Sequence, residues 1–293
     1  MNQPLRTVGR LVRLLDVITN LLKERCSLFL ACFLAFTIAI VGCRTETKQQ
    51  ATTKGDVPKT SVQVDKYWQN AKEEVYKSVL EILAQHQAEL ERGIKYHKLI
   101  HGDRTKRQVA ITFDDGPHPD YTPKLLEILR QYEAKATFFV VGKMAEKYPN
   151  LVKEQVADGH SVGNHTYHHV NLTRIPKEYI ATEIKACGEV LRSITGKAPR
   201  LFRPPGGDYD KQVAEVAEAL GYTIVLWSIN PGDYADPGEK VIETLVLKKV
   251  RNGDIILLHD GVQETIDVLP QILGFLKDKG YQLVTVDEMM GNK

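Results

Sequence analysis

Two hydrophobic patterns alternate along the chain from about residue 102 to its C-terminal end. Short apolar runs, many of them β-branched and typical of buried strands, occur at 108–113, 136–141, 160–163, 200–203, 222–228, 254–258 and 281–286. Amphipathic stretches with helical spacing lie between them, at 123–132, 150–158, 177–194, 210–220, 239–250 and 264–278. This alternation predicts an α/β fold with a parallel sheet, either closed as a barrel or open and doubly wound.

The N-terminal segment has a different pattern. Residues 27–42 are sixteen residues without a charge, and Lys23, Glu24 and Arg25 precede them. This run is short for a membrane-spanning helix, which needs about 20 apolar residues, and it fits the apolar region of a secretory signal better. It ends in the sequence IVGC, which resembles the lipobox of bacterial lipoproteins and makes Cys43 the expected lipidation site. An uncleaved signal anchor is the alternative, and both interpretations place the rest of the chain outside the cytoplasmic membrane.

Four segments follow from these patterns. We expect a signal peptide or membrane anchor over 1–42 and a flexible tether over 43–64, which is polar and too poor in apolar residues to fold. A helical spacer is expected over 65–101, where apolar residues fall roughly on one helical face. The main folded domain is expected over 102–293, where the strand and helix patterns alternate.

The charge is distributed unevenly. The chain has 39 basic and 37 acidic residues, but residues 1–42 contain five basic and two acidic ones, so the remainder has a net charge of −1. Nucleic acid is therefore not an expected partner, because no basic excess exists to neutralise phosphates. Cys187 is the single cysteine after Cys43, which excludes a disulfide framework in the folded part.

Ionisable residues follow several of the predicted strands. Asp114 and Asp115 come after the first strand, His165 after the third and His259 after the sixth, and Arg203 ends the fourth. The carboxyl ends of parallel strands meet at one edge of a sheet or one end of a barrel. These side chains are therefore expected to converge on one active site.

His165 and His169 have the spacing of a metal-binding pair. On one helical turn, residues i and i+4 point the same way, so both imidazoles could bind one metal ion. A carboxylate as third ligand would leave a coordination position open, as in catalytic zinc-type sites. Of Asp114 and Asp115, one could bind the metal while the other takes a proton from water. Alone, Asp-Asp-Gly is more often a polar turn than a metal site, and His168 points away from the His165/His169 face.

Five segments together resemble the ordered motifs of the polysaccharide deacetylases, carbohydrate esterase family 4, also called the NodB homology domain. They are TFDDGP (112–117), HTYHH (165–169), FRPPGG (202–207), WSINPGDY (227–234) and LLH (257–259). The resemblance covers the chain from about residue 100 onward. It implies a distorted (β/α)₇ barrel and metal-dependent hydrolysis of acetyl groups from N-acetylated sugar polymers.

The family motifs also imply roles for the first set of residues. Matched position by position, Asp115, His165 and His169 would be the metal ligands and Asp114 the general base. Zinc is the expected metal, although two His and one Asp also suit cobalt or nickel.

The remaining roles are implied in the same way. Arg203 would orient Asp114, and His259 would be the general acid. Leu257 and Trp227 would line the pocket for the acetyl methyl group. A backbone N–H at about Gly206 would stabilise the oxyanion together with the metal.

Two of these motifs depart from the family pattern. Gly206 stands where many relatives have an aromatic or other larger residue, so a sugar-facing side chain is lost. Asn230 and Tyr234 stand where the family often has Asp and Trp. Asp233 is then the expected carboxylate partner of His259, with Asn230 as the alternative.

The sequence therefore predicts a surface-tethered deacetylase of cell-wall glycan, acting on N-acetylglucosamine or N-acetylmuramic acid of peptidoglycan. Chitin or chito-oligosaccharides are the nearest alternative substrates, and O-acetyl xylan is a more distant one. A catalytically inactive glycan-binding lipoprotein is the alternative from another class. A glycosidase with two carboxylates would leave the histidine pair unexplained.

Overall fold

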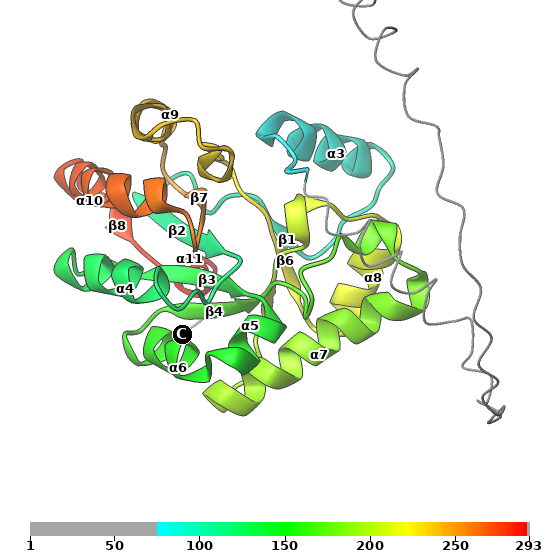
Figure 1. Cartoon of the computed structure of the whole chain (residues 1–293). Coiled ribbons are helices and arrows are strands. Elements are labelled where there is room, and N and C mark those ends of the chain that lie inside the picture. The colour runs from blue at the N-terminus through cyan, green and yellow to red at the C-terminus, as the bar shows by residue number, and fades with distance from the viewer. Residues whose placement is uncertain (1–74, 292–293) are drawn as a thin grey trace, which may run out of the picture. The chain divides into compact units, whose positions relative to one another are not determined.

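The computed structural model describes residues 75–291, which alternate between strands and helices over most of their length (Figure 1). The strands are β1 (Lys98–Leu99), β2 (Gln108–Asp114), β3 (Ala136–Val140), β4 (Ser161–Asn164), β5 (Leu201–Phe202), β6 (Thr223–Val225), β7 (Asp254–His259) and β8 (Gln282–Leu283). The helices are α3 (Val79–Glu91), α4 (Thr122–Gln131), α5 (Gly142–Lys147), α6 (Pro149–Ala157), α7 (Lys177–Thr195), α8 (Lys211–Ala219), α9 (Glu239–Lys249), α10 (Gln263–Asp278) and α11 (Val286–Met289). Each strand and helix predicted from residue 108 onward is present, with shifted ends.

Within residues 75–291, all neighbouring strands run parallel in one eight-stranded sheet. The order is β1-β6-β5-β4-β3-β2-β7, and β8 pairs with the start of β2. The chain after β6 returns to β7 through a bridge between Ile229 and Ile256, and the Leu257 N–H donates to the Ile229 carbonyl at 2.9 Å. The sheet is thus curled, with helices on its outside (Figure 1), and the expected distorted (β/α)₇ barrel is confirmed.

Side-chain alternation along β2 and β7 separates the core into an outer and an inner part. Val109, Ile111 and Phe113 pack in one apolar cluster with buried residues of α4 and α10, whereas Ala110 belongs to the other cluster. Because side chains alternate along a strand, Asp114 lies on the same face as Ala110. Asp114 is paired in register with His259 of β7, so both side chains emerge on the inner face at the carboxyl ends of neighbouring strands.

Residues 75–101 are part of this fold. β1 adds a strand to the sheet beside β6, which the sequence analysis did not identify. Helix α3 lies inside the predicted spacer and begins with a capping box between Ser78 and Glu81. At its C-terminal end the buried Glu89 forms an ion pair with Lys98 and accepts a hydrogen bond from the Tyr209 hydroxyl at 3.0 Å. These contacts fasten the helix to the barrel.

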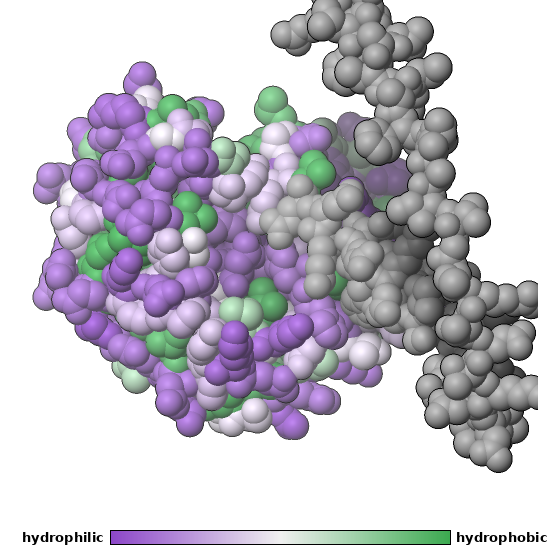
Figure 2. All heavy atoms as spheres, viewed as in Figure 1, coloured by the Kyte–Doolittle hydropathy of each residue, from purple (hydrophilic) through white to green (hydrophobic). Residues whose placement is uncertain are grey.

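The predicted signal segment 1–42, Cys43 and the tether 43–64 lie outside the described residues. Within residues 75–291, every helix is too short or too polar to cross a bilayer. The face shown in Figure 2 is mostly hydrophilic, with scattered apolar side chains. Cys187 is buried and has a free thiol, as the single cysteine in this part of the chain predicts.

Candidate active site

The ionisable residues predicted at strand ends do converge at the carboxyl end of the barrel. Asp114 ends β2, Asp115 follows it, and His259 ends β7 beside them. The loop after β4 brings His165 to 3.4 Å from Asp115, measured between Nε2 and Oδ1. Arg203 follows β5 and reaches Asp114 at 2.7 Å. The carboxyl ends of four strands that are widely separated in sequence therefore supply one site, as expected for parallel strands.

Asp115, His165 and His169 have the arrangement of a metal-binding set. Asp115 Oδ1 lies 3.0 Å from His169 Nε2, and one ligand atom of each residue lies within 4.8 Å of the other two. His165 Nδ1 is 2.7 Å from the Arg203 carbonyl, so it carries the proton and Nε2 keeps its lone pair. Among residues 75–291, the buried Nε2 of His165 and Oδ1 of Asp115 have no hydrogen-bond partner. These three donors fit one divalent cation with coordination positions left open.

The prediction that a helical turn aims the two imidazoles together was wrong. Residues 165–169 form a loop, in which Thr166 has φ 63° and His169 has φ 57°. The Thr166 carbonyl accepts from the Gly142 N–H of α5 at 3.0 Å, and its own N–H donates to the Asn164 side chain at 2.9 Å. Both groups are thereby withdrawn from helical hydrogen bonding. The positive φ of His169 brings the second imidazole back to Asp115 instead.

The electrostatics keep Asp115 ionised. Burial alone would raise the pKa of its carboxyl group, but His169 and His165 hold that pKa well below its usual range. Asp115 also has φ 73°, an unusual backbone conformation for a residue other than glycine. Strained backbone of this kind is typical of functional sites.

Asp114 is held by a fully buried arginine. Arg203 Nη1 donates to Asp114 Oδ1 at 2.7 Å and to Thr112 Oγ1 at 2.8 Å, while Nε donates to the Val225 carbonyl at 3.1 Å. Burial lowers the pKa of Arg203, and Asp114 opposes that shift. Asp114 Oδ2 stays without a hydrogen-bond partner within the described residues and lies 3.7 Å from His165 Nε2. One carboxylate oxygen is thus fixed and the other faces the metal-binding set.

His259 has Asp233 as its partner. The Asp233 carboxylate lies 2.8 Å from His259 Nδ1 and accepts from the His259 backbone N–H at 2.7 Å and from the Thr265 hydroxyl at 2.6 Å. Burial would lower the pKa of His259, but Asp233 raises it to about 9. The alternative residue, Asn230, accepts instead from the Gly232 N–H at 2.9 Å. His259 Nε2 is buried without a partner in this part of the chain, so it can give a proton to a group in the site.

The predicted substrate-contacting residues adjoin this centre. Trp227 and Leu257 are fully buried and belong to the same apolar cluster. Gly206 has φ 64° in a turn over Pro205–Gly207. A Cβ on Gly207 would lie 2.6 Å from the Trp227 ring, so glycine at 207 allows this loop to approach the indole.

Sequence reasoning missed two side chains at the site. Thr265 fixes the partner of His259, and Tyr76 places its ring 4.9 Å from the His259 ring. Neither residue belongs to a motif, and Tyr76 precedes the predicted catalytic domain. No pattern in the sequence indicates either contact.

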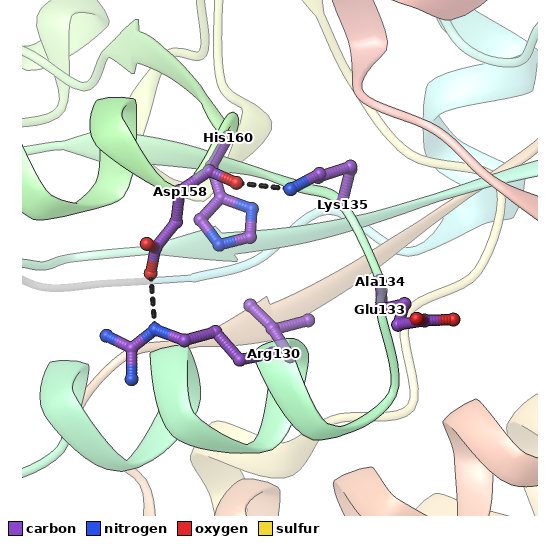
Figure 3. A pocket seen from close by; sticks show the side chains of 7 residues that line it. Arg130, Glu133, Ala134, Lys135, Asp158 and His160 are labelled. Carbon is purple, nitrogen blue, oxygen red and sulfur yellow. Dashed lines mark hydrogen bonds and ion pairs between the residues drawn. The ribbon is translucent and has the colours of Figure 1, made fainter.

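A cavity of about 270 Å³ lies at the opposite end of the strands, where β3 and β4 begin (Figure 3). Arg130, Lys135, Asp158 and His160 contribute to its lining, and Arg130 is paired with Asp158 at 2.8 Å. Burial lowers the pKa of His160 to about 4, and its Nδ1 accepts from a backbone N–H at 3.2 Å. The residues that line the cavity include none of the predicted site residues.

Comparisons with known proteins agree with this geometry. Residues 101–225 match the family model for polysaccharide deacetylase. A peptidoglycan-N-acetylglucosamine deacetylase of Bacillus cereus is 44% identical over 190 residues, which cover 63% of this chain and 89% of that protein. The peptidoglycan-N-acetylmuramic acid deacetylase PdaA of Bacillus subtilis is 32% identical over 203 residues, which cover 68% of this chain and 77% of that protein.

A solved structure shows the same likeness. The crystal structure of a peptidoglycan N-acetylglucosamine deacetylase in complex with 4-naphthalen-1-yl-N-oxidanyl-benzamide aligns with a TM-score of 0.67 and 35% sequence identity. The alignment covers 70% of this chain and 97% of that structure. The matched fold is therefore nearly the whole of that protein.

Proposed function

The chain belongs to the polysaccharide deacetylase family, and from this premise we propose that it removes acetyl groups from N-acetylated sugars of peptidoglycan. One observation carries the proposal. The Asp115–His165–His169 set shares one end of the barrel with a carboxylate fixed by arginine and an imidazole fixed by carboxylate. Hydrolysis of an amide needs these functions together, because an amide is a poor electrophile with a poor leaving group.

Asp115, His165 and His169 would hold the cation. A divalent ion bound there supplies Lewis-acid polarisation of the acetyl carbonyl and activation of water. Zinc is the metal we propose, because two imidazoles and one carboxylate are typical ligands of catalytic zinc. Cobalt and nickel accept the same donors.

Asp114 would act as the general base. Its free Oδ2 faces the metal-binding set and can take a proton from the attacking water, while Arg203 prevents the carboxylate from turning away.

His259 would act as the general acid. Asp233 accepts from Nδ1 and raises the pKa of His259, so the imidazolium also has a proton on Nε2, which it can give to the departing sugar amine. The two proton-transfer groups then lie on neighbouring strands, and one substrate can reach both.

Three further residues would contact the substrate. We assign the oxyanion contact to a backbone N–H at about Gly206 and the methyl pocket to Trp227 and Leu257. A small apolar pocket favours acetyl over longer acyl groups, although one methylene is worth only about 1–3 kcal/mol.

The choice of peptidoglycan rests on the relatives and on the predicted N-terminal segment. Both curated relatives described above are named as peptidoglycan deacetylases. A chain anchored at 1–42, or lipidated at Cys43, would present the barrel to the cell wall from the outer side of the cytoplasmic membrane. Chito-oligosaccharide is the second candidate substrate. A related protein from Azorhizobium caulinodans, named chitooligosaccharide deacetylase, is 40% identical to this chain over 159 residues.

Acetate release from three polymers tests the function. We expect the purified full-length chain to release acetate from peptidoglycan faster than from chitin oligomers, and to leave acetylated xylan nearly untouched. A chelator should abolish the release, and added zinc should restore it. Release that survives complete removal of metal would contradict the mechanism, and a preference for chitin oligomers would replace the proposed substrate.

The pH profile of Asp233→Asn tests the general acid. His259 must be protonated to act, so activity of the unchanged chain should fall as pH rises through about 9. Without the Asp233 charge, burial dominates and the pKa of His259 falls, so we expect the alkaline decline about 1–3 pH units lower. Asp236→Asn, an exposed aspartate in the same loop, is the matched control and should leave the profile unchanged. If the alkaline decline in activity occurred at the same pH in Asp233→Asn as in the unchanged chain, His259 would not be the general acid.

A further inference from the structure

Residues 75–77 lie directly on the turn that contains Gly206. The Lys77 N–H donates to the Gly206 carbonyl at 2.9 Å, and Lys77 Nζ forms an ion pair with Asp208 at 3.0 Å. A Cβ at position 206 would lie 2.8 Å from the Val75 carbonyl oxygen, closer than real Cβ atoms approach. Glycine at 206 therefore makes room for this segment of the chain.

This contact places Tyr76 beside the centre of the site. Its ring stacks on Tyr234, with centroids 4.0 Å apart, and meets His259 edge-on at 4.9 Å. The Trp227 ring lies 6.5 Å away. Tyr76 is half-buried and Tyr234 is 41% exposed, so the two rings form an aromatic surface that is still open to solvent.

The aromatic surface flanks the site without closing it over the metal-binding set. The side chains of Asp115 and His169 keep 30% and 16% of their surface exposed, whereas His259, beneath Tyr76, keeps 2%. A molecule that reaches the metal-binding set from solvent would thus have Tyr76 and Tyr234 at its side, next to the group that we propose protonates the amine.

The position of Tyr76 is fixed before any substrate binds. Lys77 Nζ also donates to the Gln85 side chain of α3 at 2.6 Å, and Gln85 Nε2 donates to the Tyr209 carbonyl at 3.2 Å. Ser78 caps the same helix directly after Lys77. A side chain held in this way loses little conformational entropy on binding, which favours affinity.

We propose that Tyr76, together with Tyr234, forms the wall against which a sugar ring of the glycan packs when its acetyl group is hydrolysed. This inference rests on the proposed function, because it takes an N-acetylated glycan as the substrate. A pyranose ring has apolar C–H faces and polar edges, and the tyrosine ring offers a flat apolar face with a hydroxyl at its rim. Tyr76 is thereby a substrate-binding residue that the segment before the barrel supplies.

Steady-state kinetics of the full-length chain on soluble N-acetylglucosamine oligomers test the proposal. Tyr76→Ala should raise KM about tenfold or more, as removal of a central aromatic contact does, and should change kcat much less. Tyr76→Phe keeps the ring and should stay within about threefold of the unchanged chain in KM. Leu80→Ala on the exposed face of α3 is the control for a change in the same segment, and its kinetics should be unchanged.

Two results would overturn the proposal. An unchanged KM in Tyr76→Ala would show that the ring does not bind sugar, and a rise in kcat/KM would show that it obstructs the site. Calorimetric binding of the oligomer to Asp114→Asn, with and without Tyr76→Ala, separates this inference from the proposed reaction. If the unchanged chain released no acetate but Tyr76→Ala still weakened binding of the oligomer, the proposed reaction would be wrong. The proposed packing of Tyr76 against the sugar ring would still be supported.

Discussion

The His165→Ala/His169→Ala double variant is expected to lose bound metal and at least about a thousandfold in acetate release. Each substitution removes one of three donors, and the remaining Asp115 cannot hold a divalent ion at a defined position. The Lewis-acid contribution to such a reaction is several kcal/mol, and each 1.4 kcal/mol corresponds to about tenfold in rate. Metal content by atomic emission and acetate release on the same preparation measure both effects.

His168→Ala is the matched control for this variant. His168 lies between the two ligands but points to Glu183, with 2.7 Å between its Nδ1 and a carboxylate oxygen. The metal content of the His168→Ala variant should be unchanged, and its activity should stay within about threefold of the unchanged chain, because no proposed ligand is lost. Thermal unfolding of each variant checks that the buried His165 site has not collapsed. Turnover by a folded, metal-free double variant would exclude metal catalysis.

Asp114→Asn is expected to reduce kcat by about 10²–10⁴-fold, the usual contribution of a positioned general base. The amide has the same shape as the carboxylate, and its oxygen can still accept from Arg203, but it takes no proton from water. Metal content should remain that of the unchanged chain, since the proposed ligands are Asp115 and the two imidazoles. Emission analysis and single-turnover acetate release measure the two quantities separately.

This variant also tests the division of roles between the adjacent aspartates. If Asp114→Asn lost metal while Asp115→Asn retained it, the assignments of ligand and base would have to be exchanged. Asp120→Asn, an exposed aspartate in the same loop, controls for the loss of a negative charge near the site. We expect a lower melting temperature for Asp114→Asn, because the buried Arg203 then faces a neutral partner.

Most of the barrel could be predicted because its strands are buried on both faces. Strands such as β2 and β7 read as continuous apolar runs, and helices such as α4 and α10 carry one apolar face. The convergence of Asp114, His165, Arg203 and His259 followed from parallel topology without any knowledge of contacts. These features depend on local pattern and on a general rule of sheet geometry.

The features that the sequence did not predict depend on contacts between distant segments. β1 is two residues long and becomes a strand only by pairing with β6. The loop that carries His165 and His169 takes its shape from hydrogen bonds with α5, a short helix that the hydrophobic pattern did not indicate. The position of Tyr76 depends on a backbone contact with Gly206 across the fold.

The register between β2 and β7 separates the chemistry of this protein from its specificity. Asp114 and His259 are paired residues of adjacent parallel strands, so the main chain keeps their Cα atoms about 5 Å apart. The lengths of the loops above the sheet do not affect the distance between these two Cα atoms. Insertions and deletions there can alter which glycan enters, or which segment of chain flanks it, while Asp114 and His259, the proposed base and acid, keep their spacing. Such a scaffold can evolve new substrates by changing its loops alone.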